Sequence, residues 1–136
     1  MTSFSNRLVF TPLSHVLNHL ETAATWAEEE WGYILNKGIA RRKEILLELK
    51  QHTYIGRLEN SNQPIAMFVL EPKIIEQFPN AQGLKYVYIH KEYRGLGFSQ
   101  QLINHAKMLA KESGAELIIL ITLKPSLNYI PYTNEF

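Results

Sequence analysis

The feature that most constrains this chain is the direct succession of a strand, a two-glycine loop and a helix. Residues Leu84 to His90 alternate between two faces, as a β-strand does. After the loop with Gly95 and Gly97, apolar residues at steps of three and four predict a helix from Phe98 to Ser113. A second apolar strand, Glu116 to Leu123, follows directly. This unit predicts a βαβ crossover between parallel or nearly parallel strands.

The rest of the chain supplies the other layers of a mixed, mostly antiparallel α/β (α+β) sheet flanked by helices. In chain order, the expected elements are an extended piece at Arg7–Thr11, helices at Leu13–Trp31 and Ile39–Gln51, and a hairpin of Tyr54–Glu59 and Ile65–Leu70. In the second helix, Arg41 and Arg42 are expected on the solvent face. Pro72 is expected to end the hairpin, and the stretch that contains Pro79 and Gly83 to be irregular.

Composition narrows the class of protein. With 136 residues, of which 46% are hydrophobic, residues 1–136 are expected to form one domain with one core. The formal charge of +1 gives no basic field for nucleic acid, and the absence of cysteine excludes disulfides and thiolate metal sites. No signal peptide and no apolar stretch of membrane-spanning length is visible. The default expectation is a soluble cytoplasmic protein without membrane or nucleic-acid partners.

The loop from Arg94 to Ser99 suits an anion. Gly95 and Gly97 let the backbone approach a ligand closely, the first helical N–H groups lack acceptors, and Arg94 adds a positive charge. The alternative is a plain tight turn with a solvated arginine. A nucleoside-triphosphate loop is disfavoured because Phe98-Ser99 stands where Lys-Ser/Thr is needed. A dinucleotide-binding fingerprint is disfavoured because Gln100 stands in place of a third glycine.

The sequence from Tyr88 to Leu102 resembles the acyl-CoA loop of the GNAT N-acetyltransferase superfamily, whose pattern is Arg/Gln-x-x-Gly-x-Gly/Ala. Here the pattern reads Arg94-Gly95-Leu96-Gly97-Phe98-Ser99. It departs at Ser99, in place of glycine or alanine, and at Lys91, in place of a common proline. The similarity extends over Leu8 to Leu123, and the first helix is similar to that of a bacterial branch. It implies an acyl-CoA N-acyltransferase fold without the usual last two strands.

The resemblance also implies roles for individual residues. The backbone N–H groups of the loop would hold the CoA pyrophosphate, and the strand edge would pair with the pantetheine arm. These expected cofactor-binding residues are Tyr88, Ile89, His90, Arg94, Gly95, Leu96, Gly97, Phe98 and Ser99. The backbone N–H of Ile89 would polarise the thioester carbonyl. Tyr132, and after it Tyr129, would be the acid for the departing thiolate, although Asn128 does not keep the family's usual spacing to that tyrosine.

The general base is left open among carboxylates and a histidine. Glu71, His90 and the run from Glu28 to Glu30 are the candidates, because each can accept a proton from an amine. His15 and His19 stand four residues apart in the first helix, but no third ligand matches their spacing. No metal is therefore expected.

Two classes of function fit these residues. The first is an acetyl-CoA-dependent N-acetyltransferase in which a primary amine of a small molecule or protein attacks directly in a ternary complex; the acceptor is not identified. The second is an inactive acyl-CoA-binding or protein-interaction module of the same fold. The apolar strand Glu116–Leu123 also needs a cover for its edge, either the tail Pro125–Phe136 or a second copy. A homodimer is favoured because Pro125 and Pro131 make the tail a poor strand.

Overall fold

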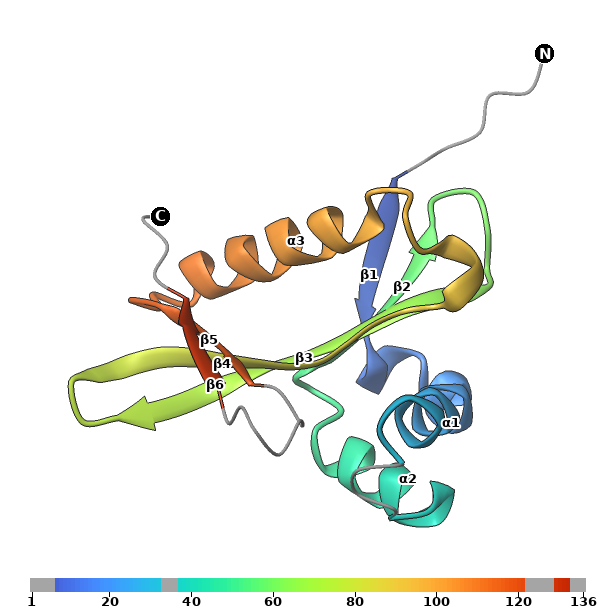
Figure 1. Cartoon of the computed structure of the whole chain (residues 1–136), viewed down its shortest axis with the longest axis horizontal. Coiled ribbons are helices and arrows are strands. Elements are labelled where there is room, and N and C mark those ends of the chain that lie inside the picture. The colour runs from blue at the N-terminus through green and yellow to red at the C-terminus, as the bar shows by residue number, and fades with distance from the viewer. Residues whose placement is uncertain (1–6, 33–36, 122–128, 133–136) are drawn as a thin grey trace.

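A single mixed sheet runs through the computed structural model, which describes residues 7–32, 37–121 and 129–132. Its strands lie side by side in chain order (Figure 1). Every neighbouring pair is antiparallel except β4 and β5, which are parallel. The strands are β1 (Leu8–Pro12), β2 (Thr53–Leu58), β3 (Pro64–Ile75), β4 (Phe78–Ile89), β5 (Ile118–Ile121) and β6 (Tyr129–Tyr132).

Helices cover both faces of the sheet. Helices α1 (Leu20–Trp31) and α2 (Ile39–Glu48) pack on one face, and α3 (Phe98–Glu112) packs on the other (Figure 1). The side chains of β4 alternate between the two cores, with Tyr86 and Tyr88 toward α1 and with Leu84 and Ile89 toward α3. The predicted class, a mixed and mostly antiparallel sheet flanked by helices, is confirmed.

The predicted crossover is present as β4–α3–β5. Helix α3 buries Leu102, Ala106 and Ala110 completely, because these residues form one stripe at a spacing of four. Gly114 follows the helix with φ +83°, the left-handed conformation expected after a helix end. The unit places the glycine loop at the end of β4, next to the start of α3.

The first helix is shorter than the sequence predicts. Two 3-10 turns, Leu13–His15 and Leu17–His19, precede α1, which begins at Leu20. A tertiary contact competes with the helix here, because the backbone N–H of Ser14 donates to the carbonyl of Lys50 at 3.1 Å. His15 and His19 therefore lie in separate turns and not on one α-helical face.

The central hairpin is longer than the sequence predicts. β3 continues through Pro72, and β4 already begins at Phe78, so the expectation that Pro72 ends the hairpin and that Pro79 to Gly83 is irregular is wrong. β2 pairs with β3 only as far as Val69. Pro72 thus lies where β3 has a free edge, and its missing N–H needs no partner there.

Strand β6, the described part of the predicted tail, covers the outer edge of β5. Strand β6 pairs antiparallel with β5, with Pro131 opposite Ile119, so the expectation that this tail is a poor strand is wrong. An edge strand tolerates proline because one of its sides has no neighbour. The tail is one of the two predicted covers, and the homodimer stays a prediction.

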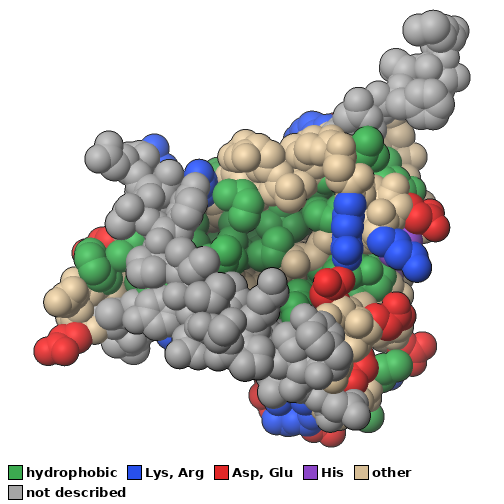
Figure 2. All heavy atoms as spheres, in the orientation of Figure 1, with side chains coloured by type: hydrophobic (Ala, Val, Ile, Leu, Met, Phe, Trp, Pro, Cys, Tyr) green, Lys and Arg blue, Asp and Glu red, His purple; other side chains and the backbone are tan. Residues whose placement is uncertain are grey.

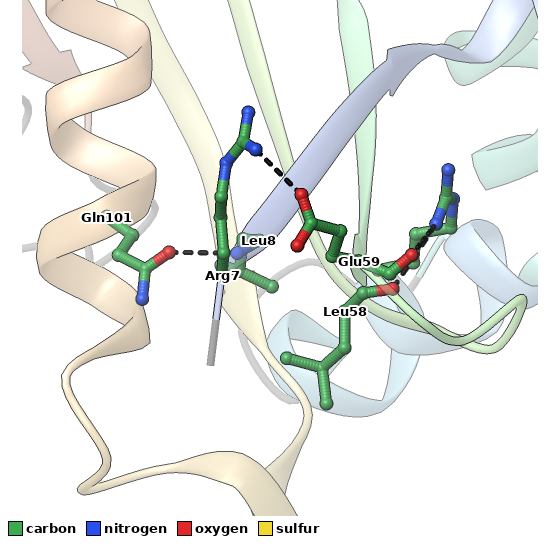
Figure 3. A network of polar contacts seen from close by, with 6 residues as sticks. Arg7, Leu8, Leu58, Glu59 and Gln101 are labelled. Carbon is green, nitrogen blue, oxygen red and sulfur yellow. Dashed lines mark hydrogen bonds and ion pairs between the residues drawn. The ribbon is translucent and has the colours of Figure 1, made fainter. Parts of the chain in front are cut away.

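Figure 3 shows the contacts that join the start of α3 to β1, the edge strand of the sheet, and the residue after β2 to the residue before β1. The side-chain oxygen of Gln101 accepts the backbone N–H of Leu8 at 2.8 Å, and Arg7 forms an ion pair with Glu59 at 2.7 Å. The second turn of α3 is thereby held against β1. No helix in the described ranges is long and apolar enough to cross a membrane.

An aromatic cluster joins α3 to the strands below it. His105 stacks on Phe10 at 4.9 Å between ring centroids, and Tyr54 stacks on Phe68 at 5.0 Å. Burial lowers the pKa of His105 below the usual 6.5, and the Glu112 carboxylate opposes that shift. Folding therefore favours the neutral form of this imidazole.

The neutral His105 predicts a stability that depends on pH. Below pH 6.5 the unfolded chain binds the proton while the folded chain still resists it, so the free energy of unfolding falls as the pH falls. His105→Phe should reduce this slope, and His15→Gln, at an exposed turn, should keep the wild-type slope. Urea unfolding above and below pH 6.5 measures both. Equal slopes in His105→Phe and wild type would contradict this assignment.

Candidate active site

The glycine loop forms an uncapped helix start. A 3-10 turn, Lys91–Tyr93, leads from β4 to the loop, and Gly95 and Gly97 have φ of +78° and +85°. In the described part of the chain, no side chain caps the N-terminus of α3, and no atom beyond the chain neighbours lies within 4 Å of a Cβ placed on either glycine. The space over the glycines is therefore open and the first N–H groups of the helix have no side-chain acceptor there, which suits an anion.

The end of β4 has an open edge beside this loop. β5 pairs with β4 only at residues 82–84, so no described strand borders β4 from Lys85 to Ile89 on that side. The N–H of His90 donates to the carbonyl of Ile65 at 2.7 Å. Hydrogen-bonded and non-bonded residues alternate along an antiparallel pair, so Ile89 points its N–H and carbonyl away from β3. Of the three predicted edge residues, Ile89 is the one whose backbone faces the opening.

A β-bulge produces this orientation. Val69 lies opposite Lys85, but Met67 lies opposite Tyr88, so β4 contains one extra residue. Tyr86 has φ +53°, the only positive φ of a non-glycine residue in the described ranges. If the register set by Lys85 and Val69 continued without a bulge, Ile89 would lie opposite Ile65 and would direct its N–H into the sheet.

One cleft of about 320 Å³ unites the loop with this edge. Most of the predicted cofactor-binding residues line it, whereas Leu96 is 63% exposed and His90 lines a neighbouring groove. Gly97 caps the helix beside the cleft without lining it. The lining consists of Glu30, Val87, Tyr88, Ile89, Tyr93, Arg94, Gly95, Phe98 and Ser99.

Apolar side chains continue the site along α3. A cavity of about 250 Å³ lies between α3, β4 and β5, lined mainly by Leu84, Ile103, Ile118 and Leu120. Figure 2 shows hydrophobic side chains gathered in a hollow below α3, with basic and acidic side chains beside one another at one end. A cavity of about 400 Å³ between the first turns and β2 is larger but shares no residue with the loop, so size alone does not locate the site.

Arg94 lies across the cleft, with 48% of its side chain exposed. Its guanidinium forms an ion pair with Glu30 at 2.8 Å, donates to the carbonyl of Ile89 at 2.7 Å and lies 5.4 Å from the centre of the Tyr88 ring. Sequence reasoning predicted a positive charge at the loop but did not predict this bridge. The bridge joins the last turn of α1 to the end of β4.

A second groove of about 260 Å³ lies on the other side of Tyr88, between α1 and the end of β4. Trp26 stacks on Tyr88 at 4.9 Å and forms its floor. Of the residues that the structure describes, Tyr88 alone lines both the groove and the cleft. Burial raises the pKa of the Tyr88 hydroxyl, the Arg94 guanidinium opposes that shift, and the carboxylates of Glu29 and Glu30 add to it.

Ion pairs reduce the set of candidate bases. Glu28 pairs with Arg42, Glu30 with Arg94, and Glu71 with Lys85 at 3.0 Å. Within the described ranges, Glu29 forms no ion pair or hydrogen bond, and it lines the groove. Nothing in the sequence distinguishes the three neighbouring glutamates, because their partners come from distant segments.

His90, the other candidate base, also forms a hydrogen bond. Its Nδ1 accepts the backbone N–H of Glu92 at 3.3 Å, so the neutral ring carries its proton on Nε2. The lone pair that a base needs is thus occupied. His90 can donate a hydrogen bond into the groove but is poorly arranged to take a proton from an amine.

The expected acids stand on the edge strand. Tyr129 lies opposite Ile121 and Tyr132 opposite Ile118 in the β5–β6 pair. Their side chains lie outside the described part of the structure. Their backbone places β6 next to β5, on the side away from β4.

Arg42 is buried, against the prediction of a solvent-facing side chain. It is 1% exposed, its Nε forms a 3.0 Å ion pair with Glu28, and its Nη1 donates to the hydroxyl of Tyr86 at 3.1 Å. Helical periodicity missed this residue because a charged side chain normally belongs to the polar face. Arg42 links α1 and α2 to the bulge residue of β4.

Comparison with known proteins gives one family and many structures of the same fold. The sequence profile of the acetyltransferase (GNAT) family matches residues 15–132. No curated protein sequence matches the chain significantly.

Three solved structures illustrate the likeness. A Mycobacterium tuberculosis protein in complex with CoA is 12% identical, with a TM-score of 0.67, over 87% of this chain and 66% of that one. A GNAT-family acetyltransferase described as putative, from Staphylococcus aureus, is 20% identical, with a TM-score of 0.63, over 83% and 98%. N-acetylglutamate synthase from Neisseria gonorrhoeae, complexed with coenzyme A and N-acetyl-glutamate, is 14% identical, with a TM-score of 0.63, over 90% and 26%. At these identities the likeness shows the fold.

The buried Arg42 predicts a large loss of stability on truncation. Arg42→Met should lower the free energy of unfolding by about 3 kcal/mol, because Glu28 and the Tyr86 hydroxyl lose a buried partner. Arg41→Met, next to it but exposed and paired with Glu44, should cost less than about 1 kcal/mol. Adding Glu28→Leu to Arg42→Met should restore part of the loss. Urea unfolding of the four proteins measures this, and equal losses for the two arginines would refute the role of burial.

Proposed function

This chain belongs to the acetyltransferase (GNAT) family, and on that premise we propose that it transfers an acetyl group from acetyl-CoA to a primary amine. The acceptor is a small molecule or a protein, and the amine attacks directly in a ternary complex. The observation that carries the proposal is the open β4 edge at Ile89, which shares one cleft with the uncapped start of α3.

The cleft fits an acyl-CoA. The space over Gly95 and Gly97 and the free N–H groups of α3 suit a pyrophosphate. The outward N–H and carbonyl of Ile89 suit an amide of a pantetheine arm, in the manner of an added strand. The guanidinium of Arg94 donates a hydrogen bond to the Ile89 carbonyl, so a bound pantetheine arm would have to share this carbonyl or replace the Arg94 contact.

The same backbone group suits carbonyl polarisation. A fixed N–H that points into a cleft can stabilise the negative charge that develops on a thioester oxygen during attack. Ile89 meets this requirement because the bulge at Tyr86 sets its direction. The carbonyl carbon then gains a bond to nitrogen and loses its bond to sulfur.

Two protons have to move. The amine must lose one before or during attack, and Glu29 is the candidate carboxylate without a partner in the described ranges, acting directly or through water. The CoA thiolate must gain one, for which the resemblance ranks Tyr132 before Tyr129, although the register places Tyr129 nearer to the end of β5 that points toward Ile89. The balance is one ammonium and one acetyl thioester to one amide, one thiol and one proton.

The loop glycine provides the test of CoA binding. Gly97→Val should abolish most acetyl-CoA affinity, because a branched side chain would cover the helix N–H groups. Gly114→Val is the matched control, since its φ of +83° equals that of Gly97 within a few degrees and its Cβ also meets no atom within 4 Å. Both variants should lose similar stability, but only Gly97→Val should lose affinity. Calorimetric titration measures the affinity, and unchanged binding in Gly97→Val overturns the pyrophosphate site.

Arg94→Ala should reduce acetyl-CoA affinity less than Gly97→Val does. Its guanidinium is already compensated by Glu30, so its removal costs the loop little positive charge. The same titration measures this variant. A larger loss in Arg94→Ala than in Gly97→Val would mean that the side chain, and not the backbone, binds the phosphates.

The rate of turnover tests whether Tyr132 is the acid that protonates the CoA thiolate. Tyr132→Phe should lower kcat by roughly a hundredfold while leaving acetyl-CoA affinity nearly unchanged, because the acid acts only as the thiolate forms. Tyr129→Phe should retain most of the activity. Release of free CoA with a panel of amines measures both. A wild-type rate in Tyr132→Phe assigns the proton to Tyr129 or to solvent, and binding without turnover in wild type would favour the inactive acyl-CoA-binding module.

A further inference from the structure

The groove beside Tyr88 runs lengthwise along α1. Its helical wall consists of residues that recur at steps of one, three and four and so occupy one stripe over two turns. The strand side supplies Tyr88, His90 and Lys91. The residues of the helical stripe are Glu21, Thr22, Thr25, Trp26 and Glu29.

The floor of the groove is aromatic. Trp26 is 7% exposed, stacks on Tyr88 with 25° between the ring planes, and meets the edge of His90 at 6.3 Å. One face of the Trp26 ring is covered by Tyr88, so the floor offers the small exposed part of these rings, an apolar surface that favours methylene groups. A slender aliphatic chain fits such a surface, and its charges would meet the carboxylates of the groove.

A carboxylate stands near each end of this floor. Glu21 and Glu29 are eight residues apart, which separates their positions by about 12 Å along the helix axis. Glu29 has no ion-pair partner in the described ranges, and Glu21 has an exposed 3.5 Å pair with Lys43, a contact that exchanges readily with water. Among the described residues, Lys91 is the only lysine or arginine that lines the groove, so the two carboxylates of the groove leave a net negative charge.

One end of the groove lies next to the cleft. Tyr88 separates the groove from the cleft, and both Glu29 and Glu30 influence its hydroxyl electrostatically. The Glu29 end is therefore next to the cleft and the Glu21 end is remote from it. Tyr88 thus borders both the groove that Glu29 lines and the cleft that contains the open edge at Ile89.

We propose that this groove is the acceptor site and that the acceptor is an aliphatic diamine or polyamine bound along α1. The distal ammonium pairs with Glu21, the chain lies on Trp26, and the proximal amine lies at Glu29. The proximal ammonium loses its proton, its nitrogen bonds to the acetyl carbon, and the carbon–sulfur bond breaks to release CoA. This inference rests on the proposed function and adds the class of substrate to it.

A homologous series of amines tests the inference. Diamines from diaminobutane to diaminodecane are compared with n-alkylamines of the same carbon number, with release of free CoA as the readout. The preferred diamine should exceed its matched monoamine in kcat/KM by about threefold, as expected for one added exposed ion pair. Equal values for diamines and monoamines would overturn the assignment.

Charge variants test the two ends separately. Glu21→Gln should raise KM for the preferred diamine several-fold and leave the monoamine unchanged, while Glu29→Gln should lower kcat/KM for both. Glu48→Gln, an exposed glutamate on α2 outside the groove, is the matched control and should change neither. If Glu21→Gln and Glu48→Gln behave alike with the diamine, the groove does not bind its distal charge.

A binding measurement separates this inference from the proposed function. The preferred diamine, or diaminooctane if no amine is turned over, is titrated calorimetrically into the wild-type chain and into a variant with both Glu21→Gln and Glu29→Gln. Binding that the double variant loses supports the groove even if no acetyl transfer occurs. Absence of diamine binding to the wild-type chain overturns the inference, even if acetyl-CoA binds and other amines are acetylated.

Discussion

The site depends on one extra residue in β4. The bulge at Tyr86 shifts the pairing with β3 by one position, and this shift turns the backbone of Ile89 out of the sheet. β5 leaves β4 after Leu84, so the outward groups face a cleft and not another strand. A continuous ladder would have used these groups for sheet hydrogen bonds, because buried backbone groups are nearly always paired.

Helices α1 and α2 hold the bulge in place through a buried charge. Arg42 reaches Tyr86 and Glu28 at once, so the strained residue of β4 and the end of α1 share one partner. The hydroxyl of Tyr86 and the carboxylate of Glu28 satisfy the guanidinium in a region that excludes water. Such a network has few alternative arrangements, because a partner that moves away leaves a buried charge unpaired.

Three successive glutamates at the end of α1 thus have three environments. Glu28 forms an ion pair with the buried Arg42, Glu30 forms one with Arg94 at the cleft, and Glu29 lines the groove. Successive helical positions differ by about 100° in direction, so neighbours of one chemical type point to different surroundings. The pair between Glu30 and Arg94 also links the helix that forms the groove to the loop that forms the anion site.

The sequence by itself determined the crossover, the glycine loop and the two faces of the site strand, because hydrophobic period and helix-start signals act within a dozen residues. Through resemblance to a known loop, it also predicted that Ile89 belongs to the site. Only the tertiary structure decided that Arg42 is buried, that Arg94 is bridged, that Glu29 has no partner among the described residues, and that β3 passes through Pro72. Each of these depends on a partner, or on a free edge, more than a dozen residues away in the chain. Local patterns carry no record of such partners, because their free energies arise only when the sheet and helices have packed.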